Sequence, residues 1–225
     1  MENFLRTFLI IHIFAGILAL LSGIIAIFSK KGMTTHNISG SVYYWSMIVI
    51  GFTAFGIAIP KGNMFLLMIG GFSTYMTLTG VRFLTFRKNS PARFRPIDFC
   101  FVVLGLITLI VPTWYFTQIG WGRIGGFAIV FLVFGLFLLS MLVGDLKNST
   151  KLSTYPKVWF LRMHISRMMG AFIATVTAFL VQNWQSDPVF IAWLLPTVIF
   201  TPVIIYFQKQ LNPKRKNRPT LGLHE

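Results

Sequence analysis

The sequence predicts an all-α fold, an integral membrane bundle of seven transmembrane helices with the N-terminus outside and the C-terminus in the cytoplasm. The chain is 55% hydrophobic and only 11% charged, whereas soluble domains carry about 25% charged residues. Seven apolar stretches approach the roughly 20 residues that cross a bilayer. The basic residues between these stretches gather on one side of the membrane, as the positive-inside rule requires.

Residues 1–207 are predicted to form one seven-helix transmembrane domain, and 208–225 a basic cytoplasmic tail. Nothing outside the apolar stretches is long enough to bury a core of its own. The first stretch lacks a small-residue cleavage site, so we expect a retained helix rather than a removed signal peptide. The seven predicted spans are Phe4–Phe28, Ser39–Ile59, Met64–Phe86, Ile97–Gln118, Ile124–Gly144, Trp159–Val181 and Val189–Phe207.

The formal charge of +15 comes from 20 Lys and Arg against 5 Asp and Glu. In a soluble protein this balance would indicate nucleic acid binding. Here the charges lie between apolar spans, so we expect no nucleic acid partner and contact with anionic lipid headgroups of a bacterial inner membrane. Only Arg6, Lys61 and Arg123 are assigned to the outer side. The fourteen assigned to the cytoplasmic side are Lys30, Lys31, Arg87, Lys88, Arg93, Arg95, Lys147, Lys151, Lys157, Lys209, Lys214, Arg215, Lys216 and Arg218.

The first three spans carry polar side chains that we expect to face the bundle interior. His12 shares a face of the first span with small residues, and small residues allow helices to approach closely. At 1.5 Å per residue His12 lies about 24 Å from the inner end of that span. His36 immediately precedes the second span. The third span is unusually polar, and Tyr75, Thr79 and Arg82 are its predicted interior residues.

The later spans add charges at the cytoplasmic edge. Asp98 begins the fourth span, and Asp145 directly follows the fifth. The seventh contains Pro196 and Pro202, which predict a kink or a local opening near mid-membrane. Carbonyls freed by such prolines line a cavity in some membrane proteins.

The sixth span is the stretch most indicative of a site, because it carries three ionisable residues at its beginning. These are Arg162, His164 and Arg167. A helical period places Thr175 on the same face as His164. An ionisable group at membrane depth is a functional-site candidate by default.

The most specific hypothesis is b-type haem binding for electron transfer at this cytoplasmic-edge site. His36 and His164 would be the axial ligands of the iron, and Arg82, Arg162 and Arg167 would hold the propionates. Gly40, Gly170 and Ala171 would leave room for the ring. The sequence has no CxxCH motif.

Other hypotheses use the same residues. In a purely structural one, Arg82 pairs with Asp98, and Arg162 or Arg167 pairs with Asp145. A transporter or sensor of a small anionic or lipidic molecule would use His12 and the polar third span as its cavity. A zinc-dependent membrane hydrolase would need three converging ligands, and the sequence lacks HExxH and HxxxH. The single cysteine, Cys100, excludes an intramolecular disulfide.

Several segments resemble a family of bacterial polytopic membrane proteins whose activity is not established. The resemblance runs through nearly the whole chain and implies the same fold, with attention on His12, His36 and His164. It is carried by HISRMMGAFIATVTAFLV from His164, LLPTVIFTPVIIYF from Leu194, and an N-terminal pattern of His12, Gly16, Ser22-Gly23, Lys31-Gly32, His36, Gly40 and Tyr43. Many members look to have a basic-aromatic cluster after the late His, where this chain has Ile165-Ser166-Arg167-Met168. A looser likeness to cytochromes that hold haem between helices motivates the haem hypothesis.

Overall fold

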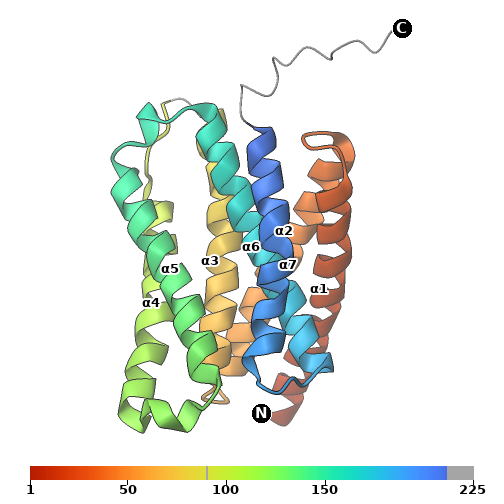
Figure 1. The fold of residues 1–225 in the computed structure, drawn as a ribbon, viewed down its shortest axis with the longest axis vertical. Coiled ribbons are helices and arrows are strands. Elements are labelled where there is room, and N and C mark those ends of the chain that lie inside the picture. The colour runs from red at the N-terminus through yellow and green to blue at the C-terminus, as the bar shows by residue number, and fades with distance from the viewer. Residues whose placement is uncertain (90, 212–225) are drawn as a thin grey trace, which may run out of the picture.

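The computed structural model describes residues 1–89 and 91–211, which fold into a bundle of long helices (Figure 1). Two short 3₁₀ turns, at Trp121–Ile124 and Leu152–Thr154, lie in the connections on either side of the fifth helix. The seven α-helices are α1 Glu2–Phe28, α2 Thr34–Ala58, α3 Met64–Lys88, α4 Pro96–Ile119, α5 Phe127–Ser149, α6 Lys157–Asn183 and α7 Phe190–Gln210.

All seven α-helices are long and apolar enough to cross a membrane, which confirms the predicted number of spans. They contain 21 to 27 residues. At 1.5 Å per residue, they extend about 32 to 40 Å, against roughly 30 Å for the hydrocarbon core of a bilayer. α1 begins and α7 ends at opposite ends of the bundle, as an odd number of antiparallel crossings requires (Figure 1).

Four predicted boundaries, in three helices, are corrected. α2 begins at Thr34 rather than Ser39, so His36 belongs to its first turn. α5 begins at Phe127 rather than Ile124, because a 3₁₀ turn precedes Gly125, whose φ of 56° cannot continue a helix. α5 also extends to Ser149 and therefore includes Asp145. α7 continues to Gln210, into the predicted tail of 208–225; residues 212–225 lie outside the described part of the chain.

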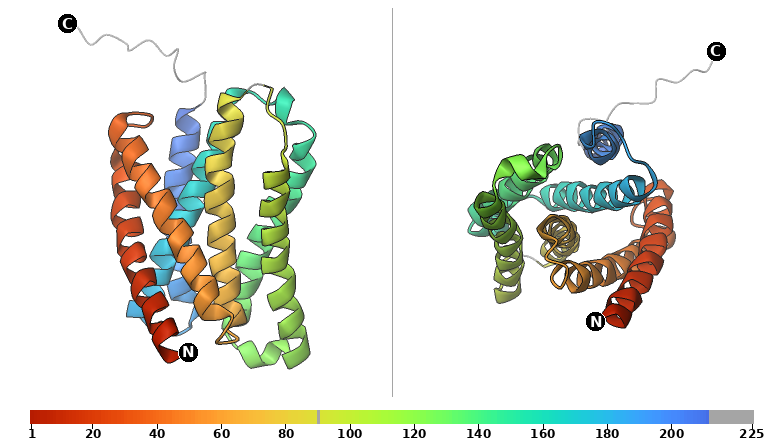
Figure 2. Two further views of the ribbon diagram at one scale, coloured as in Figure 1. Left: turned by 180° about the vertical axis from the view of Figure 1, so that it is seen from behind. Right: turned by 90° about the horizontal axis from the view of Figure 1, so that it is seen from below.

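α3 is the central helix of the bundle. It packs against α2, α4, α5 and α6, and the view along the axis places it inside the ring formed by the others (Figure 2). Within its most apolar window, 72% of the residues are buried, against 11% for α7. A helix surrounded by protein need not be apolar, which explains why a span as polar as α3 can be the innermost.

Glycines allow the helices around α3 to approach one another closely. A Cβ on Gly71 of α3 would lie 2.8 Å from the Cβ of Thr108 on α4. A Cβ on Gly23 of α1 would lie 2.6 Å from the ring of Phe172 on α6. Only a hydrogen fits at such contacts, so these glycines set the spacing between helices.

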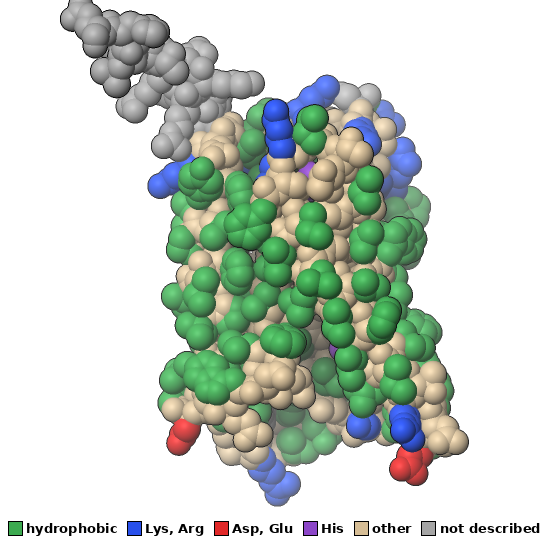
Figure 3. Space-filling view, turned by 90° about the vertical axis from the view of Figure 1, so that its right-hand side faces the viewer, with side chains coloured by type: hydrophobic (Ala, Val, Ile, Leu, Met, Phe, Trp, Pro, Cys, Tyr) green, Lys and Arg blue, Asp and Glu red, His purple; other side chains and the backbone are tan. Residues whose placement is uncertain are grey.

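The outer surface carries apolar side chains between two charged ends (Figure 3). Many large aliphatic and aromatic residues are exposed along α1, α2, α4, α5 and α7. Soluble monomers rarely expose continuous apolar patches of this extent, and lipid is the solvent that suits them. We call the end at which α3 finishes and α4 begins the basic end. Among its described residues are Lys30, Lys31, Arg87, Lys88, Arg93, Arg95, Lys147, Lys151, Lys157 and Lys209.

The two prolines of α7 do not interrupt it. The helix runs from Phe190 to Gln210 with both Pro196 and Pro202 inside. Pro196 is buried and Pro202 is exposed. Neither proline lines the two cavities described below, which lie among other helices.

Candidate functional site

Arg82, near the end of α3, forms a two-point ion pair with Asp98 in the first turn of α4. Its Nε and Nη2 donate to the two carboxylate oxygens at 2.6 and 2.9 Å. The carboxylate also accepts the backbone N–H of Arg95 at 2.7 Å. The guanidinium lies 4.4 Å from the ring centre of Phe86, which fixes it from the other side. This pairing, predicted from the sequence, is confirmed, and it lets a buried carboxylate remain charged.

A second carboxylate, Asp145 of α5, is held by two donors from other helices. The phenol of Tyr75 donates to one of its oxygens at 2.5 Å, and Nη2 of Arg167 donates to the other at 2.8 Å. Tyr75 is fully buried and Arg167 is 5% exposed. Of the two predicted partners of Asp145, Arg167 is therefore confirmed. Arg162 lies five residues earlier on α6, half-buried near the basic end.

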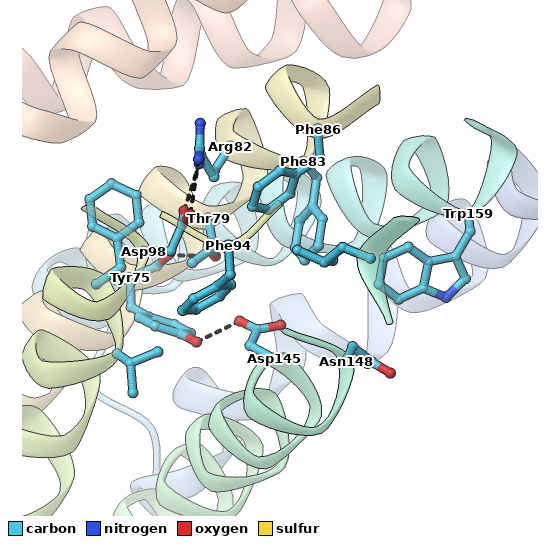
Figure 4. A pocket seen from close by; sticks show the side chains of 13 residues that line it. Tyr75, Thr79, Arg82, Phe83, Phe86, Phe94, Asp98, Asp145, Asn148 and Trp159 are labelled. Atoms are coloured by element: carbon cyan, nitrogen blue, oxygen red, sulfur yellow. Dashed lines mark hydrogen bonds and ion pairs between the residues drawn. The ribbon is translucent and has the colours of Figure 1, made fainter. Parts of the chain in front are cut away.

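Arg82, Asp98 and Asp145 border one small cavity, which we call the inner cavity (Figure 4). Its volume of about 30 Å³ is room for one or two water molecules. An aromatic wall is formed by Phe83, Phe86, Phe94, Phe101 and Trp159. The polar groups on it are those of Tyr75, Thr79, Arg82, Asp98, Asp145 and Asn148. The cavity therefore brings together the predicted site residues that α3, α4 and α5 supply.

A wider pocket, which we call the vestibule, adjoins the inner cavity at the connection between α3 and α4. Its volume is about 220 Å³. Arg82, Phe86 and Phe94 line both spaces. The other residues around the vestibule are Asn89, Pro91, Arg93, Arg95 and Pro96. The vestibule and the inner cavity are therefore neighbours that share three wall residues.

His36 and His164 both lie near the basic end, but they do not line the inner cavity. Nδ1 of His36 is 2.9 Å from the carbonyl of Ala26 in α1, and Nδ1 of His164 is 2.9 Å from the carbonyl of Gly80 in α3. Because a carbonyl only accepts, Nδ1 carries a proton in each ring, and in the neutral form of the imidazole Nε2 keeps a lone pair.

The space near these histidines differs from the one expected for a haem ring. A Cβ on Gly40 would meet no atom within 4 Å, so this position is open. Gly170 faces the sulfur of Met76, 2.7 Å from the place of its missing Cβ, and Ala171 is fully buried. The position beside Gly40 is therefore open, whereas the predicted space at Gly170 and Ala171 is filled.

The remaining predicted interior residues make local contacts. His12 lies 2.9 Å from Thr53, which donates its own hydroxyl proton to a carbonyl of α2 and so accepts from the imidazole. α2 supplies this partner because α1 and α2 are packed side by side. Thr175 is buried and donates to the carbonyl of Ala171 at 2.9 Å. Figure 3 shows histidine side chains at two heights of the bundle.

Among residues 1–89 and 91–211, no group of three His, Cys, Asp or Glu side chains is placed to hold a metal ion. A zinc hydrolase site would need such a group.

The sequence did not predict the vestibule. From the sequence, Arg93 and Arg95 are predicted only to lie on the cytoplasmic side and so to set the orientation of the chain in the membrane. The one available signal was the Arg-Phe-Arg-Pro run, which places two arginines just before a proline that begins a helix.

The fold and the polar interior define an α-helical protein of the multi-pass membrane class. Comparison with known proteins adds no relative: no family model, no curated protein and no solved structure matches the chain. The resemblance to a bacterial membrane family therefore stays a prediction, and function must be argued from the site.

Proposed function

We propose that this protein is a transporter or sensor of a small anionic or lipidic molecule, whose charged group enters from the vestibule and binds at the inner cavity as that cavity widens to admit it. The observation that carries the proposal is the lining shared by the two spaces, above all Arg82. A cation that faces both a surface pocket and a buried carboxylate is suited to receive an anion and pass it inward. Polar groups convergent on a pocket in a membrane bundle favour ligand binding.

Arg82 is suited to exchange partners. Two of its three guanidinium nitrogens, Nε and Nη2, bond to Asp98. Nη1 points away from that carboxylate and is the atom that an incoming anion would meet first. An anion that displaced Asp98 from Arg82 would leave a buried carboxylate without its cation. Because such a carboxylate is costly, ligand binding would be coupled to a movement or a protonation at α4.

The orientation and location belong to the same proposal. We infer that the basic end faces the cytoplasm and that the membrane is a bacterial inner membrane. The support is the excess of Lys and Arg at that end over the opposite one, where Arg6, Lys61 and Arg123 lie.

Ligand-dependent thermal stability tests the proposed site. Purified protein in detergent is melted with inorganic phosphate, acetate, palmitate or phosphatidylglycerol as probes. At least one probe is expected to raise Tm, because a ligand that binds only the folded state stabilises it. The rise is expected to be lost in Arg82→Gln and Tyr75→Phe but kept in Lys61→Gln at the opposite end. If no probe raises Tm, or if the rise survives both cavity variants, the proposal is wrong.

A b-type haem held by His36 and His164 is the second candidate. The observation that favours it is the pair of Nδ1 hydrogen bonds to backbone carbonyls, which leaves both Nε2 lone pairs for a metal. Haem would supply one-electron chemistry, with His36 and His164 on the iron and Arg82, Arg162 and Arg167 as the cations proposed for the propionates.

The absorption spectrum tests this second candidate. Protein expressed with ample haem is expected to show a Soret band that disappears in His36→Ala and in His164→Ala, because either change removes an axial ligand. His12→Ala is the matched control, since that imidazole lies toward the other end of α1. Absence of the band in the unaltered protein removes the haem hypothesis. A band that persists in both single variants removes the ligand assignment.

A further inference from the structure

We propose that the vestibule is a discrete site for the phosphate of an anionic phospholipid, held between Arg93 and Arg95. This inference rests on the proposed function, because it names the class of molecule that enters by this route. It is carried by three features of the vestibule: its uncompensated charge, its depth along α4 and the shape of its walls.

Within residues 1–89 and 91–211, ion pairs do not balance the charge of the vestibule. Of its three arginines, only Arg82 belongs to an ion pair. Among the described residues the ion pairs are Arg82–Asp98 and Arg167–Asp145, so the side chains of Arg93 and Arg95 have no protein carboxylate. Two guanidinium groups around a single pocket attract an anion strongly, and the planar donor fork of Arg matches phosphate oxygens.

The depth of the vestibule corresponds to the headgroup layer. α4 has 24 residues and begins at Pro96, which lines the vestibule. The helix is about 36 Å long, so its first turn lies a few ångströms beyond a hydrocarbon core of roughly 30 Å. Immediately below, Phe99 and Val103 are 57% and 52% exposed. These side chains continue the lipid-facing surface along which acyl chains would extend.

The walls suit a headgroup better than a bare ion. Phe86, Phe94, Pro91 and Pro96 give the vestibule apolar sides, and Asn89 adds an amide beside the arginines. A volume of about 220 Å³ exceeds what a single anion needs and leaves space for the glycerol end of a lipid. A soluble phosphate would use the same arginines but would gain nothing from the apolar walls.

Native mass spectrometry of lipid retention tests this inference. The full-length protein is reconstituted in phosphatidylcholine nanodiscs that contain a minor amount of phosphatidylglycerol, and the anionic lipid that stays bound is titrated. One saturable site is expected. Arg93→Gln with Arg95→Gln is expected to weaken it about tenfold or more, since hydrogen bonds to charged groups are lost. Both side chains are exposed, and Gln keeps the backbone N–H that Asp98 accepts, so the variant should fold.

Lys151→Gln with Lys157→Gln is the matched control. It removes the same charge from exposed positions at the same end, outside the vestibule. This variant is expected to retain the saturable site. Equal weakening in both double variants would mean diffuse attraction and would overturn the inference. So would equal retention of phosphatidylcholine, or binding of inorganic phosphate at the same affinity without lipid. Because the assay does not involve Tyr75, its outcome is separate from that of the cavity test.

Discussion

At the scale of single residues, the charged side chains of the interior form ion pairs in which acidic and basic groups neutralise each other. Asp98 has three donors at 2.9 Å or less, and Asp145 has two. Removing one member of such an ion pair lowers the free energy of unfolding more than removing both members, because the remaining charge stays buried without a partner. Arg167 shows the limit of this arrangement, since its Nη1 is buried and donates to no partner among the described residues.

Asp98→Asn tests this asymmetry. The change leaves Arg82, which is 13% exposed, without a countercharge, and we expect a loss of about 3 kcal/mol in the free energy of unfolding. Chemical unfolding in detergent micelles measures it. Arg82→Met combined with Asp98→Leu should recover most of the loss. Lys147→Gln, an exposed change nearby, should stay within about 0.5 kcal/mol. A double variant as unstable as the single one would contradict the explanation.

Tyr75→Phe isolates one hydrogen bond. The ring remains, so its contact with the guanidinium of Arg167, 5.4 Å from the ring centre, is preserved. Asp145 loses the phenol donor, and the expected cost is about 1–3 kcal/mol. Thr117→Val, at an exposed hydroxyl of α4 near the opposite end, is the control and should be close to neutral. Unfolding that is unchanged by Tyr75→Phe would mean that the hydrogen bond contributes nothing.

At the scale of elements, the packing of α3 against α4 positions the site. The two helices carry Arg82 and Asp98, and Gly71 lets them meet near their middle. The sequence indicated a polar third span but not which neighbour each face would contact. Helices that are apolar on nearly every side give little information about their rotation.

Gly71→Ala should separate α3 from α4. The added Cβ would lie 2.8 Å from the Cβ of Thr108, a contact that requires a shift of the backbone, and we expect a loss of about 1–3 kcal/mol of stability. Gly16→Ala is the matched control, because its Cβ would meet no atom within 4 Å. An alanine there should be neutral or stabilise α1 by up to about 1 kcal/mol. Similar losses in both variants would show that packing at Gly71 is not special.

At the scale of the whole molecule, the bundle has two chemically different ends. The basic end contains the vestibule, both ion pairs and two of the histidines. The opposite end contains Glu2 and Asp187 with few basic residues. If orientation follows this difference, every candidate site opens toward the cytoplasm.

Cysteine labelling in intact bacterial cells tests the orientation. In a Cys100→Ser background, Lys61→Cys is expected to react with a membrane-impermeant maleimide, whereas Lys151→Cys is expected to react only after the cells are opened. The two lysines are both exposed and lie at opposite ends. The reverse pattern would place the vestibule outside and would contradict the inferred threading.

The sequence by itself determined the seven helices, their antiparallel order and the gathering of basic residues at one end. Each span must match the bilayer with its own length and composition, so this information is local. It also supplied the pairing of Arg82 with Asp98, because both lie at the same depth. Only the tertiary structure decided that Arg167 reaches Asp145, that His12 bonds to α2, and that Arg93 and Arg95 border a pocket. These outcomes depend on helix rotation and on a connecting segment, and both are set by contacts between distant parts of the chain.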